Sequence, residues 1–103
     1  KEDIAVCTAL AGEMLGLKMM YLEAGSGAKN PVPESMIEAV RGAISTPLLV
    51  GGGIRTPEKV AACFCAGADV VVVGNAIEQE PGLIRDMAAV TRSFNANQII
   101  NAP

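Results

Sequence analysis

Apolar residues recur along the chain at two spacings, one typical of helices and the other of strands. In residues 2–16 every third or fourth position is apolar, which predicts an amphipathic helix that ends near Gly16 as a left-handed cap. The same spacing predicts three more helices, at residues 33–44, 56–67 and 81–91. Short apolar runs, typical of strands covered on both faces, lie between the helices at residues 18–23, 48–50 and 70–73.

Local signals mark where two of these helices begin. Pro33 opens the second helix, and Thr56-Pro57 supplies an N-cap followed by a first-turn proline for the third. The apolar residues that we expect the helices to pack inward are Val6, Leu10, Met14, Leu17, Met36, Ile37, Val40, Ile44, Val60, Ala61, Phe64, Ala68, Leu83, Ile84, Met87 and Val90. The pattern does not place the tail, residues 94–103.

Strands that alternate with helices predict an α/β fold with a parallel sheet and right-handed crossovers. Each predicted strand ends in a glycine-rich or polar cluster, which favours a (β/α)₈ barrel over an open sheet with one switch point. A complete barrel needs about 250 residues, and rarely fewer than about 200. We therefore expect residues 1–103 to be a single partial domain. It would be the C-terminal portion of a TIM barrel, about three βα units plus a preceding helix.

Composition narrows the range of functions and compartments. The net charge is −3 and no run of Lys or Arg occurs, so non-specific nucleic-acid binding is not expected. No apolar stretch reaches the roughly 20 residues of a transmembrane helix, and residues 1–17 do not resemble a signal peptide. We expect a cytoplasmic protein whose cysteines, Cys7, Cys63 and Cys65, are reduced, buried apolar residues and not zinc ligands.

Charged residues on the predicted helices are expected to form a solvated face. They are Glu34, Glu38, Arg41, Glu58, Lys59, Arg85 and Asp86.

Glycines follow the last two predicted strands, where (β/α)₈ barrels often hold a phosphate. Residues 51–53 are three consecutive glycines, which let backbone N–H groups approach an anion near a helix start. Gly74-Asn75 follows the last strand and adds further donors. A phosphate or phosphate ester is therefore the expected ligand. Arg55 either contacts the phosphate or forms an outer salt bridge, and the sequence leaves both open.

A third cluster follows the first predicted strand, in residues 21–27. Side chains alternate between the two faces of a strand, so Tyr21 and Glu23 lie on the same face. Glu23 either accepts hydrogen bonds from a ligand hydroxyl or takes its proton, or else it forms a structural ion pair. Tyr21 either packs in the wall or donates its hydroxyl. The Gly25-Ser26-Gly27 segment is either a flexible lid or another set of N–H donors.

Three strings, YLEAGSGA (21–28), VGGGIR (50–55) and ADVVVVGNAIE (68–78), resemble the geranylgeranylglyceryl phosphate synthases and their heptaprenylglyceryl relatives. The resemblance covers the chain to about residue 93. It implies a prenyltransferase in which the C3 hydroxyl of sn-glycerol 1-phosphate attacks C1 of a long prenyl diphosphate, with Mg²⁺ assisting release of diphosphate. It implies that Glu23 is catalytic. The glycerol phosphate site that it implies comprises Tyr21, Leu22, Glu23, Ala24, Gly25, Ser26, Gly27, Gly52, Gly53, Gly74 and Asn75.

The same resemblance implies features that lie outside these strings. We find no acidic cluster for Mg²⁺, so its ligands and much of the prenyl groove are expected outside this chain. A homo-oligomer at full length, and membrane proximity through the lipid product, are also expected. The chain alone is expected to be inactive.

Two other functions remain open. One is another phosphate-binding barrel enzyme, such as a sugar-phosphate isomerase or aldolase. Schiff-base aldolases need a lysine in the pocket, and Lys18 lies at the wrong end of its strand. The other is a non-catalytic phosphate-binding half-barrel that pairs with a partner chain, because three strands leave two open sheet edges.

Overall fold

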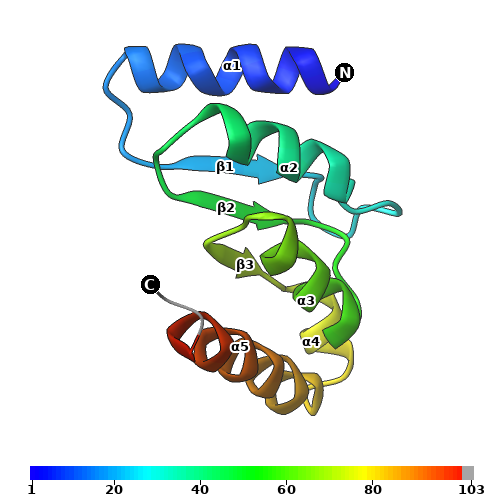
Figure 1. The fold of residues 1–103 in the computed structure, drawn as a ribbon. Coiled ribbons are helices and arrows are strands. Elements are labelled where there is room, and N and C mark those ends of the chain that lie inside the picture. The colour runs from blue at the N-terminus through cyan, green and yellow to red at the C-terminus, as the bar shows by residue number, and fades with distance from the viewer. Residues whose placement is uncertain (101–103) are drawn as a thin grey trace.

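The computed structural model describes the backbone of residues 1–100 and the side chains of residues 1–98. Within residues 1–100, three parallel strands form one sheet in the order β1-β2-β3, and five helices accompany them (Figure 1). In chain order the elements are α1 (Glu2–Met14), β1 (Met20–Glu23), α2 (Glu34–Ala43), β2 (Leu48–Gly51), α3 (Pro57–Ala66), β3 (Val70–Val72), α4 (Asn75–Gln79) and α5 (Leu83–Ile100). The predicted parallel α/β fold is therefore confirmed.

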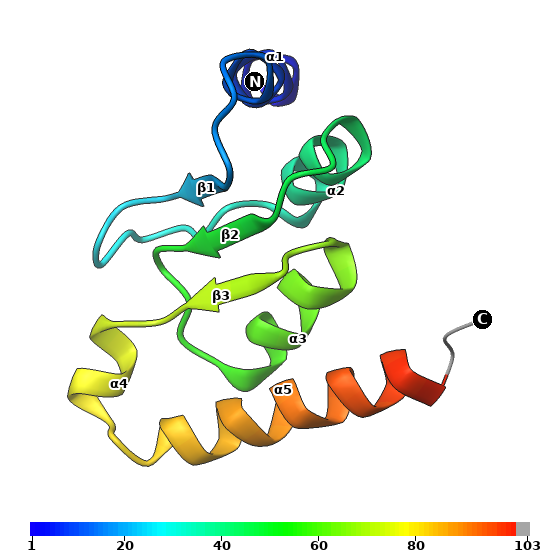
Figure 2. The ribbon, with the colours of Figure 1, turned by 90° about the vertical axis from the view of Figure 1, so that its left-hand side faces the viewer.

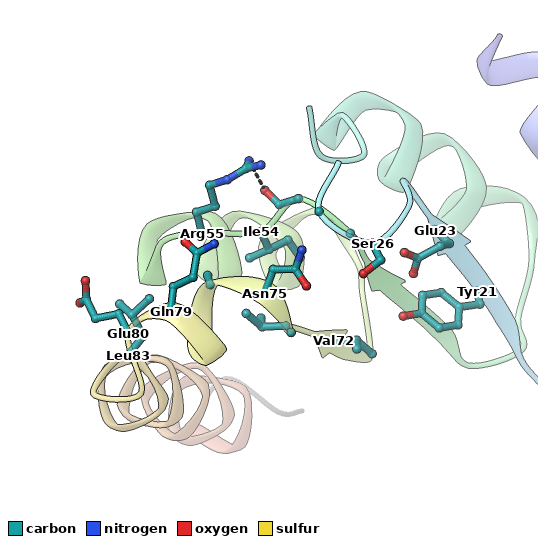
Figure 3. Close-up of a pocket in the computed structure, with 16 residues that line it drawn as sticks. Tyr21, Glu23, Ser26, Ile54, Arg55, Val72, Asn75, Gln79, Glu80 and Leu83 are labelled. Carbon is teal, nitrogen blue, oxygen red and sulfur yellow. Dashed lines mark hydrogen bonds between the residues drawn. The ribbon is translucent and has the colours of Figure 1, made fainter. Parts of the chain in front are cut away.

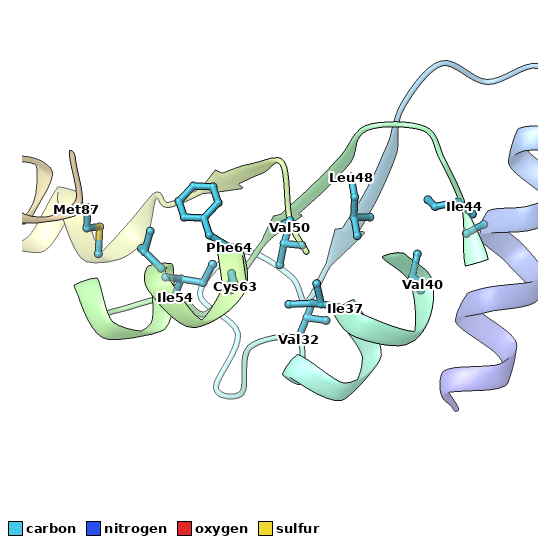
Figure 4. Close-up of a cluster of buried hydrophobic side chains, with 13 residues drawn as sticks. Val32, Ile37, Val40, Ile44, Leu48, Val50, Ile54, Cys63, Phe64 and Met87 are labelled. Atoms are coloured by element: carbon cyan, nitrogen blue, oxygen red, sulfur yellow. The ribbon is translucent and has the colours of Figure 1, made fainter. Parts of the chain in front are cut away.

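The helices form a row along one side of the sheet. Helix α1 packs on α2, α2 on α3, and α3 on α5, while α2 and α3 lie on the same side of the strands (Figure 2). Their packing encloses an apolar core between sheet and helices (Figure 4). Leu48 and Val50 of β2 are almost completely buried there, against Ile37 and Val40 of α2 and Cys63 of α3. The row resembles part of the outer helical ring of a (β/α)₈ barrel.

The opposite face of the sheet is largely open, which corrects the expectation of strands covered on both faces. Tyr21, Val70 and Val72 are 48%, 45% and 40% exposed on this face. The reason is that the helices within residues 1–100 pack on only one side. In a closed barrel, the corresponding face points into the barrel interior.

The predicted inward faces of α2 and α3 are confirmed. Ile37, Val40 and Ile44 are buried around α2, and Val60 and Phe64 are buried on α3. Around the same two helices, Ala68 is buried, whereas Met36 and Ala61 are half-buried. The Thr56 cap is also confirmed, since its hydroxyl accepts a hydrogen bond from the Lys59 N–H at 3.1 Å.

Helix α1 buries a different face from the predicted one. Ala9 and Gly12 are its buried residues, whereas Met14 is 87% exposed and Leu10 is 38% exposed. Small residues let α1 lie close to its neighbours, because a Cβ on Gly12 would come within 2.8 Å of the Met20 side chain. Leu17, after the helix, is exposed as well and Val6 is half-buried. The predicted Gly16 cap has the expected positive φ of 86°.

The last helices also differ from the prediction. Helix α4 was not anticipated, and α5 continues to Ile100, well beyond residue 91. Part of the unplaced tail is therefore helical, and residues 101–103 lie outside the described part of the chain. The Phe94 ring stacks on the Phe64 ring of α3, with 5.2 Å between the ring centroids. This contact packs α5 against the core. In α5, Met87 is buried, Leu83 and Val90 are half-buried, and Ile84 is 58% exposed.

Two of the charged pairs link elements, which corrects the expectation that their members form only a solvated face. Lys59 of α3 binds Glu34 of α2 at 2.6 Å, and this hydrogen bond lowers the pKa of Glu34. Arg41 binds Asp69 at 2.6 Å and donates to the carbonyls of Ile44 and Thr46. The Arg41 contacts join the end of α2 to the residues that precede β2 and β3.

The cysteines behave differently from one another. Cys63 is buried as expected, and burial raises the pKa of its thiol. Cys7 and Cys65 are exposed, which corrects the expectation for these two.

Candidate functional site

The loops that follow the three strands surround one cavity of about 550 Å³ (Figure 3). Parallel strands end at the same edge of the sheet, so residues from distant sequence positions meet there. The residues that line the cavity are Tyr21, Glu23, Ser26, Gly27, Gly52, Gly53, Ile54, Arg55, Val72, Val73, Gly74, Asn75, Ala76, Gln79, Glu80 and Leu83.

Eight of the eleven predicted site residues border this cavity. Three do not. Leu22 and Ala24 are half-buried and pack against the core, and Gly25 donates its N–H to Glu23 Oε1 at 3.1 Å. For Leu22 the cause is strand alternation, which turns its side chain toward the helices while its two neighbours face the cavity.

Gly51 makes room for Tyr21 and Glu23 on the open face of the sheet. It pairs with Glu23 in the β1–β2 register. A Cβ on Gly51 would lie 2.5 Å from the Tyr21 hydroxyl, 3.1 Å from Val72 Cβ and 3.2 Å from Glu23 Oε2. Burial and the neighbouring Glu23 carboxylate raise the pKa of Tyr21, so its hydroxyl stays a proton donor over a wider pH range. Gly51 was absent from the predicted site, although its register opposite Glu23 could have indicated it.

Gly52 and Gly53 adopt backbone conformations that favour glycine. Their φ values are 93° and 72°. A Cβ on Gly52 would come within 2.9 Å of Glu23 Oε1 and closer still to the Gly25 N–H. A Cβ on Gly53 would lie 2.9 Å from the Ala28 carbonyl oxygen. The loop after β1 therefore lies directly against the loop after β2.

Unpaired backbone donors gather in the same place. Among the described residues, the N–H groups of Gly52, Gly53 and Gly74 donate no hydrogen bond. Such groups need water or a ligand as acceptor. Gly52 and Gly53 belong to one loop and Gly74 to the next, and all three border the cavity. The arrangement is suited to an anion with several oxygens.

The loop after β1 also reaches the loop after β3. A Cβ on Gly27 would lie 2.5 Å from Asn75 Nδ2. Asn75 begins α4, whose Ala76 and Gln79 also line the cavity. These two residues were missed because a five-residue helix is too short to show a helical period in the sequence.

Among the described residues Arg55 forms no salt bridge, and its guanidinium binds backbone carbonyl groups. Its guanidinium donates to the carbonyl oxygens of Ala28 at 2.6 Å, Gly53 at 3.0 Å and Lys29 at 3.3 Å. The side chain borders the cavity, but its charged end is bound to the backbone of two loops (Figure 3).

The described residues do not fit a Mg²⁺ site. No group of three or more His, Cys, Asp or Glu side chains comes together in the part of the chain searched. Two carboxylates, Glu23 and Glu80, border the cavity, and they lie on opposite sides of it (Figure 3). Mg²⁺ requires oxygen ligands in near-octahedral geometry, usually with one or two carboxylates beside it.

No lysine borders the cavity formed by residues 1–98, and Lys18 precedes β1 at the opposite end of the strand. This cavity therefore lacks the amine that a Schiff-base aldolase needs.

None of the helices that the structure describes is long and apolar enough to cross a membrane.

Parallel βα units with their polar residues gathered at the strand ends are typical of (β/α)₈-barrel proteins and of open parallel α/β proteins. The comparison with known families is more specific. The chain belongs to the PcrB family, whose model matches residues 1–93.

Relatives and solved structures agree with this assignment. The chain is 56% identical over 99 residues to the geranylgeranylglyceryl phosphate synthase of Spirosoma linguale, covering 96% of this chain and 40% of that protein. It is 56% identical over 78 residues to the synthase of Pyrococcus furiosus, covering 76% of this chain and 31% of that protein.

The fold matches the solved structure of (S)-3-O-geranylgeranylglyceryl phosphate synthase from Thermoplasma acidophilum in complex with its substrate sn-glycerol-1-phosphate. The TM-score is 0.84 at 35% identity, covering 87% of this chain and 38% of that one. The prediction of a partial TIM barrel is confirmed. The chain spans two fifths or less of the length of these relatives.

Proposed function

We propose that this chain forms the glycerol phosphate site of a prenyltransferase that joins sn-glycerol 1-phosphate to a long-chain prenyl diphosphate. One observation carries the proposal. The Glu23 carboxylate and the unpaired N–H groups of Gly52 and Gly53 border the same cavity. A carboxylate accepts hydrogen bonds from hydroxyls, and backbone N–H groups bind phosphate oxygens. A phosphorylated polyol supplies both kinds of group.

The phosphate would be held by neutral donors. Gly52, Gly53 and Gly74 supply backbone N–H groups, and the Asn75 amide lies beside Gly27 at the cavity. This mode of binding suits a chain with a net charge of −3, because it needs no basic patch. Support also comes from the Thermoplasma acidophilum enzyme, which was solved with sn-glycerol-1-phosphate.

Glu23 would act on the glycerol hydroxyls. Its Oε1 is oriented by the Gly25 N–H, and its Oε2 lies above Gly51, near the Tyr21 hydroxyl. In the proposed step the C3 hydroxyl gives its proton to Glu23 while its oxygen bonds to C1 of the prenyl chain. The bond from C1 to the diphosphate oxygen breaks, and diphosphate leaves with the electron pair.

The remaining parts of the reaction lie beyond this site. We propose that Mg²⁺, which would neutralise charge on the leaving diphosphate, is bound by residues outside this chain, as is most of the prenyl diphosphate. A homo-oligomeric cytoplasmic enzyme that approaches membranes through its lipid product is consistent with this proposal.

The activity is tested with the protein expressed from its complete gene. The assay combines it with sn-glycerol 1-phosphate, Mg²⁺ and prenyl diphosphates of C15 to C35, and detects the ether product by mass spectrometry. The sn-3 enantiomer is the matched control, because it presents the same phosphate with inverted hydroxyl positions. Ether formation from the sn-1 substrate is expected. No ether with any prenyl length would contradict the proposal.

A further inference from the structure

Arg55 joins two loops through three backbone carbonyl groups. It donates to Ala28 and Lys29, in the loop after β1, and to Gly53, in the loop after β2. Within the described part of the chain, no carboxylate forms a salt bridge with it. The guanidinium therefore serves as a multiple donor to neutral acceptors. Its planar fork can reach several acceptors at once, which a lysine ammonium group on a flexible stem does less well.

Apart from those of Arg55, the hydrogen bonds that the described residues make to this loop, residues 24–33, lie near its two ends. At the start, Ala24 N–H donates to Gly51 at 3.0 Å and Gly25 N–H donates to Glu23. At the other end Val32 is buried, and Lys59 donates to its carbonyl. Between these anchors the loop contains one internal backbone bond, from Ala28 N–H to the Gly25 carbonyl. Arg55 binds this middle portion.

Gly53 allows the middle portion to come close enough for Arg55 to bind it. A Cβ there would come within 2.9 Å of the Ala28 oxygen and within 3.2 Å of Pro31 Cα. The Gly53 carbonyl then accepts from Arg55, beside the two loop carbonyls. The Arg55 contacts thus fix the β1–α2 loop directly on the glycine segment that carries the unpaired N–H groups.

The held loop brings Ser26 and Gly27 to the cavity. Both residues border it, and Gly27 lies against Asn75 of the neighbouring loop. We propose that Arg55 is a positioning residue. Its three hydrogen bonds, called the latch below, hold the β1–α2 loop beside the proposed phosphate-binding glycines, Gly52, Gly53 and Gly74. The latch thereby sets the affinity for the phosphorylated substrate. This inference rests on the proposed function for its ligand. The latch itself is independent of the reaction.

Trypsin provides a readout of the latch that needs no activity. Lys29 is exposed and is followed by Asn30, so trypsin can cleave there once the loop detaches. In the protein from the complete gene, Arg55→Ala and Arg55→Lys are both expected to speed cleavage after Lys29 at least about tenfold, because hydrogen bonds that hold the loop are lost. Arg85→Ala is the matched control. Arg85 is exposed on α5, away from the cavity, and its removal changes net charge equally.

Kinetics then separate latching from direct phosphate binding. For both Arg55 variants, the KM for sn-glycerol 1-phosphate is expected to rise about tenfold while kcat changes less than about threefold. Arg85→Ala should leave both parameters unchanged. A normal KM in Arg55→Lys would show that only the charge matters, and would overturn the latch. Unchanged cleavage at Lys29 in Arg55→Ala would overturn it too, whether or not ether synthesis is observed. Failure of ether synthesis alone would contradict only the proposed function.

Discussion

Glu23 and Gly51 occupy paired positions on β1 and β2, and the missing side chain of Gly51 leaves open the space beside Glu23 Oε2. A Cβ on Gly51 would lie only 3.2 Å from that oxygen and 2.5 Å from the Tyr21 hydroxyl. The part of the candidate site beside Tyr21 and Glu23 therefore depends on a glycine in the sheet as much as on the carboxylate.

The first prediction concerns Glu23. Glu23→Gln keeps the size of the side chain but removes the base, so kcat for ether synthesis should fall at least about tenfold with the fold intact. Steady-state kinetics and circular dichroism measure the two effects. Glu38→Gln, on the exposed surface of α2, is the control and should be neutral. Near-normal turnover in Glu23→Gln would remove Glu23 from the mechanism.

The second prediction concerns Gly51. Gly51→Ala places a methyl group against the ends of the Tyr21 and Glu23 side chains, which can move, and 3.1 Å from Val72 Cβ, which must shift slightly. The KM for sn-glycerol 1-phosphate should rise at least about fivefold, while the free energy of unfolding falls by less than about 1.5 kcal/mol. Kinetics and urea unfolding test the two parts. An unaltered KM would show that substrate does not use this space.

The third prediction contrasts two glycines. Gly53→Ala should lower the free energy of unfolding by about 1–3 kcal/mol, because φ is positive and backbone atoms of Ala28 and Pro31 block a Cβ. Gly42→Ala should raise it by about 0.5–1 kcal/mol, because Gly42 is helical with open space around it. Urea unfolding compares them. Equal effects would contradict the close loop packing described here.

The fourth prediction concerns Glu13 and acid. Glu13 Oε2 accepts hydrogen bonds from the N–H groups of Ser45 at 2.7 Å and Thr46 at 2.9 Å. These bonds lower its pKa below the ordinary 4.5. Because the folded pKa is the lower one, the stabilisation is complete above 4.5 and is lost as pH falls through the folded value.

Glu13→Gln should therefore weaken the protein at neutral pH and flatten the fall in stability below pH 4.5. Unfolding midpoints across the acid range measure this. Glu2→Gln, exposed on the same helix, should leave the profile unchanged. A Glu13→Gln profile parallel to that of the unmodified protein would exclude this contribution.

Local signals explain why much of the fold could be predicted. Thr56 is the N-cap of α3 and Pro57 lies in its first turn, so both residues mark where the helix begins. The alternation of side chains along β1 places Tyr21 and Glu23 on one face of the strand. The sequence also predicted that the site lies at the edge where the strands end, because a glycine-rich or polar cluster follows each strand. Eight of the predicted site residues meet there, although their roles in binding stay predictions.

Long-range contacts explain what could not be predicted. Helix α1 has apolar residues on several sides, and only its packing shows that Ala9 and Gly12 are the buried ones. Phe94 stacks on a residue thirty positions earlier, which no local pattern reveals. Arg55 binds carbonyl groups, which every residue carries, so its partners leave no signal in the sequence.

The most direct test of the proposed site is a crystal structure of the complete-gene protein with sn-glycerol 1-phosphate. The phosphate oxygens should lie about 2.9 Å from the N–H nitrogens of Gly52, Gly53 and Gly74. The glycerol hydroxyls should donate to Glu23. A phosphate bound elsewhere, or hydroxyls directed away from Glu23, would contradict the account.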